Sequence, residues 1–215
     1  MGFNFKLCAG LLGIVLFGTS IAAAGSADRE SRKITVLVND SAHVAPLVLS
    51  QAESEAGRIF RAAGVEIEWV GCPSGSAIAE DECRGIPGAN QFVLHIVPTG
   101  KTSSDLVFGL AFLGEGGSGK YCDVFYNRIA EAHHESDVSL SQLLGMVAAH
   151  ELGHLLLGSH AHSYVGIMTP VWRRELLRRL DMGNLLFTSE QASAMKSRIR
   201  GQEMTLISVG ASGRK

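Results

Sequence analysis

The segment HELGHLLLGSHAHSYVGIM, from His150 to Met168, constrains the fold of this 215-residue chain more than any other. The residues before it predict a helix that starts with a capping box, Ser139 and Gln142, and continues through an apolar stretch. A helix this apolar must be buried, yet it carries two histidines and a glutamate. Burying such groups without partners would cost about 1–3 kcal/mol each. The fold must therefore give them something to bind.

The spacing of these groups predicts a metal site. Residues four apart lie on one face of a helix, so His150 and His154 can direct ring nitrogens at one point. Neutral imidazole is a preferred ligand of zinc. Glu151, beside the first histidine, can take a proton from a metal-activated water and pass it to a leaving amine. The interpretation is one catalytic Zn²⁺ ion with His150 and His154 as ligands and Glu151 as general base; the alternative is a pair of satisfied core histidines.

A catalytic zinc site has three protein ligands and one open position, and His160 and His162 are the candidates for the third. The stretch HELGHLLLGSH, followed by Ile167 and Met168, resembles the metzincin zinc peptidases, whose signature is H-E-x-x-H-x-x-G-x-x-H with a later methionine turn. The pattern is nearest to that of the matrix metalloproteinases. The resemblance implies that His160, at the signature spacing, is the third ligand and that Met168 is a hydrophobic floor beneath the imidazoles.

The glycine of the signature is displaced in this chain. Leu157 stands at its position, and Gly158 follows one residue later. If the chain also turns one residue later, the third ligand moves to His162, which is followed by Ser163 as the third histidine is in many matrix metalloproteinases. We prefer His160 and keep His162 as the alternative.

The segment LAFLGEGGSGKYCDVFYN, upstream of the helix, is similar to the edge strand and glycine-rich stretch of the same family. In those enzymes the edge strand pairs with substrate backbone. The resemblance therefore implies that Gly109, Leu110 and Ala111 bind a peptide or protein substrate. It also implies that residues 169–172 form a wall of the pocket for the substrate side chain that follows the cleaved bond. The family's accessory metal ligands are not reproduced at residues 125–127. The glycines of residues 114–119 predict a mobile loop or a bulged edge strand; no Gly-Lys-Ser/Thr follows, which argues against a phosphate loop.

The remaining pattern predicts an α/β (α+β) fold: a mixed twisted sheet with an active-site helix and a helical C-terminal portion, as in a metzincin-like zincin. Apolar runs predict strands at residues 33–39, 65–70 and 91–98, and a helix at 46–64 between the first two. Thr169 and Pro170 suit the start of a helix over 171–180. Thr188 and Gln191 form a capping box for a last helix, which Gly201 is expected to end.

The N-terminal region, residues 1–24, has the pattern of a secretory signal peptide: Lys6, an apolar run and a small-residue cleavage site. We expect a mature protein from about Gly25, secreted or periplasmic/extracellular, with no membrane span after cleavage. An oxidising compartment permits disulfides. Cys72 and Cys83 bracket a polar loop and are expected to pair with each other, with Cys122 left over, although other pairings stay open.

The chain has 19 basic and 21 acidic residues and so lacks the strong excess of positive charge that is typical of nucleic-acid-binding proteins. His43, His95, His133 and His134 have no partners at ligand spacing: His95 fits a satisfied core histidine, and the 133–134 pair a solvated loop. We therefore interpret residues 25–215 as a single catalytic domain of a secreted zinc-dependent endopeptidase. The alternatives are a zinc hydrolase of a non-protein amide, such as a cell-wall peptide or a small molecule, and a non-catalytic zinc-bearing scaffold.

Overall fold

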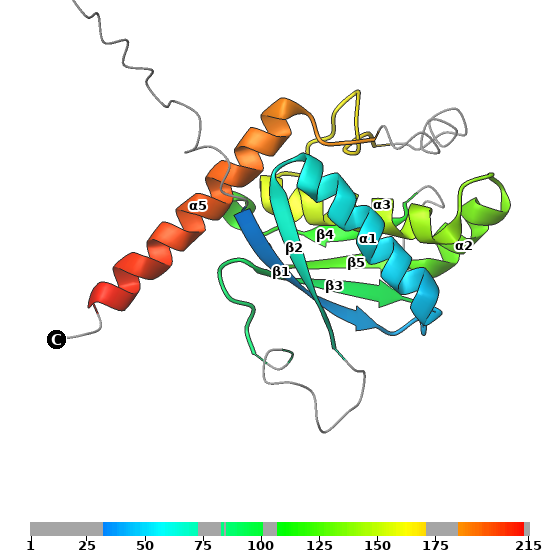
Figure 1. Ribbon diagram of the computed structural model, residues 1–215, viewed down its shortest axis with the longest axis horizontal. Coiled ribbons are helices and arrows are strands. Elements are labelled where there is room, and N and C mark those ends of the chain that lie inside the picture. Colours follow the sequence, from blue (N-terminus) through cyan, green and yellow to red (C-terminus); the bar gives the residue numbers. More distant parts are fainter. Residues whose placement is uncertain (1–31, 73–82, 84, 101–106, 171–184, 213–215) are drawn as a thin grey trace, which may run out of the picture. The chain divides into compact units, whose positions relative to one another are not determined.

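Five strands form one mixed sheet in the order β2-β1-β3-β5-β4 (Figure 1). The first four are mutually parallel, and β4 pairs antiparallel with β5 at the edge. The strands are β1 (Arg32–Asp40), β2 (Val65–Gly71), β3 (Gln91–Val97), β4 (Gly109–Phe112) and β5 (Tyr121–Phe125). The expected mixed sheet and its strands are confirmed.

The computed structural model describes residues 32–72, 83, 85–100, 107–170 and 185–212. Within α5 the description of side chains ends at residue 202. The expected signal peptide, residues 1–24, and the expected helix at residues 171–180 both lie outside these ranges.

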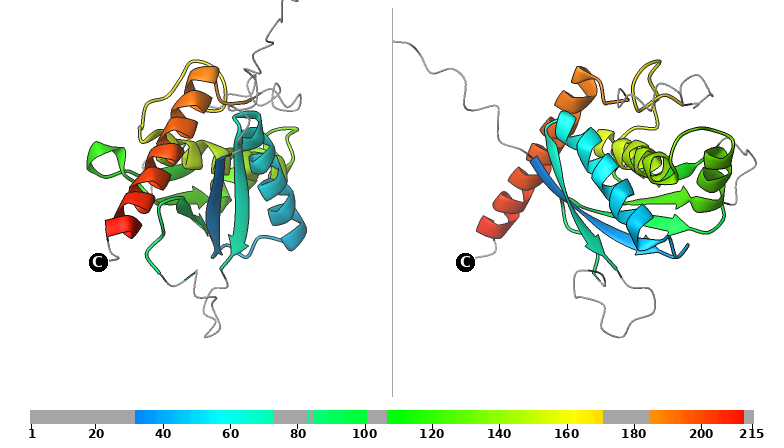
Figure 2. Two further views of the ribbon diagram at one scale, coloured as in Figure 1. Left: turned by 60° about the vertical axis from the view of Figure 1, so that its left-hand side comes forward. Right: turned by 45° about the vertical axis from the view of Figure 1, so that its right-hand side comes forward.

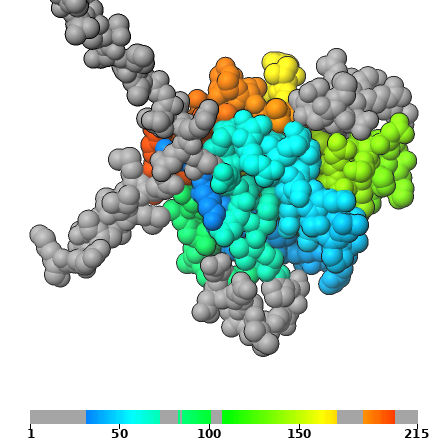
Figure 3. Space-filling model, in the orientation of Figure 1, coloured from blue at the N-terminus to red at the C-terminus, as the bar shows by residue number. Residues whose placement is uncertain are grey.

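Two helices cover one face of the sheet. These are α1 (Pro46–Ala62), which connects β1 to β2, and α3 (Leu140–Leu157). Figure 2 shows both on the same side of the strands, and in Figure 3 α1 and β2 form much of the surface that faces the viewer. The core between helices and sheet includes Ile34, Val36 and Val38 of β1 with Phe60 of α1. This layering places α3 against β5 and the edge strand β4, and the polar groups of the sequence signature lie there.

The ends of α3 follow the local sequence. The Ser139 side chain accepts a hydrogen bond from the backbone amide of Gln142, and the helix ends at Gly158, which adopts a left-handed conformation (φ 64°). Nearly every residue between is buried, including the histidines and the glutamate. The predicted helix and its caps are confirmed, and the termination at Gly158 determines the path of the chain beyond it.

The C-terminal helix α5 (Ser189–Ser212) opens with the expected capping box: Thr188 and Gln191 exchange backbone-to-side-chain hydrogen bonds of 2.9 and 3.3 Å. Its expected end at Gly201 is wrong, because the helix continues to Ser212. A single glycine costs a helix only about 1 kcal/mol relative to alanine, which is too little to stop it. Met195 and Ile199 anchor α5 in the core.

A short helix, α2 (Tyr126–His134), follows β5 and was not expected from the sequence. His133 and His134 form its last turn, so the prediction of a solvated loop is wrong; His133 Nδ1 lies 2.8 Å from the carbonyl oxygen of Val138. The glycine-rich stretch is an ordered turn, η2 (Glu115–Gly117), between β4 and β5. The histidines of α2 belong to no metal cluster among the described residues.

The other face of the sheet carries a small cluster of Leu37, Val93 and Cys72. Cys72 is bonded to Cys83, as expected, and Cys122 is a buried free thiol. His95 is also on this face, with its side chain 39% exposed and Nδ1 3.3 Å from Asp123 Oδ1. It is therefore a partly exposed residue beside a carboxylate rather than the core histidine that the strand pattern predicted. No helix in the described ranges is both long and apolar enough to cross a membrane.

Candidate metal centre

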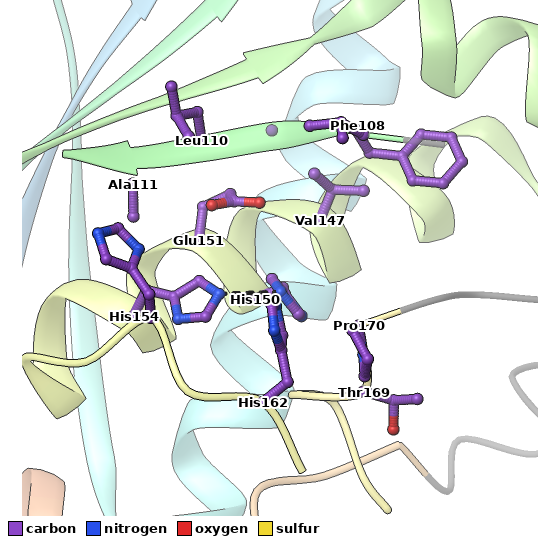
Figure 4. A pocket seen from close by; sticks show the side chains of 13 residues that line it. Phe108, Leu110, Ala111, Val147, His150, Glu151, His154, His162, Thr169 and Pro170 are labelled. Atoms are coloured by element: carbon purple, nitrogen blue, oxygen red, sulfur yellow. Dashed lines mark hydrogen bonds between the residues drawn. The ribbon is translucent and has the colours of Figure 1, made fainter. Parts of the chain in front are cut away.

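Helix α3 brings His150, Glu151 and His154 to the face that lies under β4 (Figure 4). Their side chains are only 8%, 7% and 4% exposed, respectively. One helical turn separates the two histidines, and their Nε2 atoms lie 3.1 Å apart. The helical spacing therefore produces the convergence that the sequence predicted.

The third histidine of the cluster is His162. The ligand atoms of His150, His154 and His162 all lie within 4.8 Å of one another, and His160 does not belong to the group. The preference for His160 is thus corrected in favour of the alternative. Because α3 runs to Leu157 and turns at Gly158, one residue later than in the family signature, the chain reaches the site later. His160 and His162 are both exposed and both line the cavity, but only His162 joins the cluster.

The outer nitrogens of both helical histidines have backbone partners. His150 Nδ1 lies 2.8 Å from the carbonyl oxygen of Ile167, and His154 Nδ1 lies 2.8 Å from that of Ser159. A carbonyl only accepts, so each ring donates Nδ1–H and presents the lone pair of Nε2 toward the cluster. Tetrahedral zinc with Zn–N bonds of about 2.0–2.1 Å separates its ligand nitrogens by about 3.3 Å. The donor set and its spacing fit one zinc ion.

Burial keeps these imidazoles neutral. It lowers the pKa of His150 to about 4, although the hydrogen bond to Ile167 opposes the shift. Burial also lowers the pKa of His154 and of His162, and the neighbouring histidines add to both effects. A neutral ring is the form that binds a metal, so the site is prepared for a cation at neutral pH.

Glu151 lies between the histidines and β4. Burial raises the pKa of its carboxyl to about 8, and a hydrogen bond from the backbone amide of Ala111 opposes this. A positive charge in the histidine cluster would favour the ionised form. Gly109 makes room for this side chain, because a Cβ there would lie 2.6 Å from Glu151 Cγ and 2.8 Å from the Asp123 carbonyl oxygen. The edge strand can approach the carboxylate only with glycine at position 109.

The methionine of the expected turn lies next to the site. Met168 is fully buried, and a Cβ on Gly153 would lie 2.7 Å from its sulfur and 2.8 Å from the ring of Phe187. Gly153 precedes His154 on α3, so Met168 packs directly against the ligand-bearing helix. Hydrogen bonds from Ser163 N to Met168 O and from Ile167 N to Leu186 O close the turn that holds it. Met168 is thus buried next to a ligand-bearing residue of α3, and its role as a floor beneath the imidazoles stays a prediction.

Arg198 of α5 supports the chain where it leaves α3. Its guanidinium donates a hydrogen bond to the carbonyl oxygen of Gly117 in η2. A Cβ on Gly158 would lie 2.3 Å from Arg198 Nη1, and one on Gly117 would lie 2.1 Å from the Gly158 carbonyl oxygen. A positive charge at a helix C-terminus is favourable. The β4–β5 turn, the end of α3 and α5 are therefore packed together beside the segment that leads to His162.

A cavity of about 220 Å³ opens beside the histidines. The histidines of the cluster and Glu151 line this cavity. The expected substrate residues Gly109, Leu110 and Ala111 also line it. Of the expected wall, Thr169 and Pro170 line it as well. Residues 171–172 lie outside the described ranges. Apolar walls are contributed by Val107, Phe108 and Val147, which were not expected from the sequence. Val147 lies one turn before Glu151 on α3, so helical periodicity was the available signal for it.

No family model and no curated protein matches this sequence. Among solved structures, archaemetzincin from Methanopyrus kandleri is similar with a TM-score of 0.51 and 16% identity, over 80% of this chain and 98% of that one. A zinc-dependent peptidase from Methanocorpusculum labreanum (strain Z) gives a TM-score of 0.49 and 16% identity, over 75% of this chain and 99% of that one. The likeness to archaemetzincin shows a metzincin-like fold.

The third ligand can be tested by substitution. We expect His162→Ala to weaken zinc binding at least about 100-fold, because it removes one of the three nitrogen ligands of the zinc ion. The His160→Ala protein should bind zinc like the wild type. Competition with a chromophoric chelator measures both affinities. A loss of zinc in His160→Ala with retention in His162→Ala would contradict the geometry.

Gly109 gives a test of the packing between β4 and α3. Gly109→Ala should lower the free energy of unfolding by about 1–3 kcal/mol, since the added methyl group collides with Glu151 and with backbone. Gly71→Ala is the matched control: it also lies in a strand, and its Cβ would meet nothing within 4 Å. Urea denaturation measures both. Equal stability of the two variants would show that the edge strand is not held against the carboxylate.

Proposed function

We propose that this chain is a zinc-dependent metallopeptidase that hydrolyses peptide bonds. The observation that carries the proposal is the cluster of the buried His150 and His154 with the exposed His162, which has Glu151 beside it and opens to a cavity under an edge strand. A solved structure with a similar fold is an archaemetzincin, which supports the same class.

Each residue has a separate task in this reaction. A zinc ion held by the three imidazoles would polarise the scissile carbonyl and acidify a water molecule. Glu151 takes the proton from the attacking water and delivers it to the leaving amine, so that it acts first as base and then as acid. The carbonyls of Ile167 and Ser159 hold the rings of His150 and His154 in one orientation throughout. The apolar walls keep bulk water away from the reacting groups.

The edge strand determines how a substrate lies. Among the described strands, only β5 pairs with β4, so the other edge of β4 offers backbone groups to an extended peptide beside the cavity. One side chain of that peptide can enter the cavity between Val147, Thr169 and Pro170. This open-sided arrangement supports an endopeptidase that acts on extended segments.

The position of Glu151 favours an enzyme over a structural zinc site. A structural site gains nothing from Glu151, which is 7% exposed and whose pKa burial raises to about 8. Burying such a carboxyl group beside the metal ligands costs stability, and a chemical role explains why it is there. The non-catalytic scaffold is the weaker interpretation for this reason.

We further propose that the protein is exported. The N-terminal pattern of residues 1–24 supports this, and the disulfide between Cys72 and Cys83 fits an oxidising compartment. Mass spectrometry of the protein recovered from outside the cytoplasm should find an N-terminus near Gly25. An intact Met1 terminus in a cytoplasmic fraction would contradict export.

The role of Glu151 is tested by Glu151→Gln. We expect kcat/KM on a peptide to fall by about 10²–10⁴-fold, because the amide cannot accept the proton, while zinc content and thermal stability stay near wild type. Peptide hydrolysis, zinc analysis and thermal denaturation on the same preparations measure the three quantities. Unchanged hydrolysis in the variant would remove the basis for the proposed mechanism.

A further inference from the structure

The ligand loop, residues 159–170, carries the third histidine and forms neither helix nor strand. It also supplies the carbonyl oxygens that orient the two helical histidines, those of Ser159 and Ile167. Around the third histidine most side chains of the loop are exposed, namely those of His160, Ala161, His162, Tyr164 and Val165. Burial therefore does little to hold this part of the loop, and a precise metal site on it needs support from other elements.

Gln191, in the first turn of α5, reaches the residue that follows the third histidine. Its Nε2 lies 3.2 Å from Ser163 Oγ, and its Oε1 accepts a hydrogen bond of 2.9 Å from the backbone amide of Thr188. The Ser163 hydroxyl in turn donates to the carbonyl oxygen of Val165 at 2.7 Å. Because a backbone amide only donates and a carbonyl only accepts, the Gln191 amide donates to Ser163. One side chain thus caps α5 and holds the loop beside His162.

Ser163 is the point at which this exposed stretch is attached. It is half-buried, whereas the residues on both sides of it are exposed. Its backbone amide donates to the carbonyl oxygen of Met168 at 2.9 Å, and Met168 is fully buried. Both the backbone and the side chain of Ser163 are therefore held, and the position of the preceding residue, His162, depends on them.

The same stripe of α5 holds the start of the loop. Arg198 donates to the carbonyl oxygen of Gly117 and packs against Gly158, where α3 ends. Gln191, Met195 and Arg198 are four and three residues apart, so they lie along one side of the helix. Met195 is fully buried and fixes this side against the core. In Figures 1 and 2 the start of α5 (orange) lies beside the ligand loop (yellow).

We propose that α5 braces the ligand loop at both ends and that Gln191 is a positioning residue that selects His162 over His160 as the third zinc ligand. The inference rests on the proposed zinc-dependent function. Both histidines line the cavity, and their ring centroids lie 5.0 Å (His162) and 5.9 Å (His160) from that of His154. Two imidazoles this close to the cluster compete for a metal unless the loop has a single path. The hydrogen bond from Gln191 to Ser163 fixes the path that directs His162 to the cluster.

Gln191→Glu separates the two roles of this side chain. A carboxylate still accepts the Thr188 amide, so the capping box and the thermal stability of the zinc-free protein should be kept. It cannot donate to Ser163, so zinc binding should weaken about three- to tenfold, the range expected for one lost hydrogen bond. Competition with a chromophoric chelator measures the affinity. Ser193→Glu, which adds the same charge at an exposed position of α5, is the matched control and should bind zinc like the wild type.

A second pair of variants tests whether Gln191 acts through the third ligand. In a His162→Ala background, Gln191→Glu should no longer weaken zinc binding, because the residue that it positions is absent. In a His160→Ala background it should weaken zinc binding about three- to tenfold, as in the wild type. An equal effect in both backgrounds, or an affinity of Gln191→Glu within twofold of the control, overturns the positioning role.

Ser163→Ala gives an independent route to the same bond, because it removes the acceptor and leaves the capping box of α5 intact. It should weaken zinc binding at least as much as Gln191→Glu, and the double variant should bind zinc no more weakly than Ser163→Ala alone. Additive losses in the double variant would contradict a shared hydrogen bond. A wild type that binds no zinc overturns the proposed function and this inference together. A wild type that binds zinc but cleaves no member of a mixed peptide library overturns the peptidase function alone, since the affinities still decide the role of Gln191.

Discussion

The fixation of two buried imidazoles by backbone carbonyls is the interaction on which the site depends. An apolar helix that carries His150 and His154 into the core is stable only if both ring nitrogens have partners. Ile167 O and Ser159 O satisfy the outer nitrogens, and this leaves the inner ones directed at one point. The same two carbonyls lie on the segment after α3, so they also fix the path that brings His162 into place.

Much of this arrangement is local and could be predicted from the sequence. The spacing of the two histidines on a helix, the cap at Ser139 and the stop at Gly158 involve neighbours within a few residues, and each was found where it was expected. The strands of the sheet also followed from runs of apolar residues. Their order, with β4 as the antiparallel edge, is what sets that strand over Glu151.

The third ligand could not be predicted with the same success, because it depends on packing between distant segments. The choice between His160 and His162 follows from the left-handed turn at Gly158, which is packed against Gly117 and Arg198. None of those contacts has a signature in the local sequence. The walls formed by Phe108 and Val147 have the same origin, since a strand and a helix meet there only in the folded chain. The extension of α5 past Gly201 shows the weakness of a single glycine as a stop.

A zinc ion in this site should have three imidazole ligands and one open position. X-ray absorption at the zinc edge of the loaded protein measures this coordination. We expect three imidazole nitrogens at about 2.0–2.1 Å and one further light ligand from solvent, with no sulfur. A fourth imidazole, supplied by His160, would close the open position, and a sulfur ligand would place the metal elsewhere; either result would contradict the account.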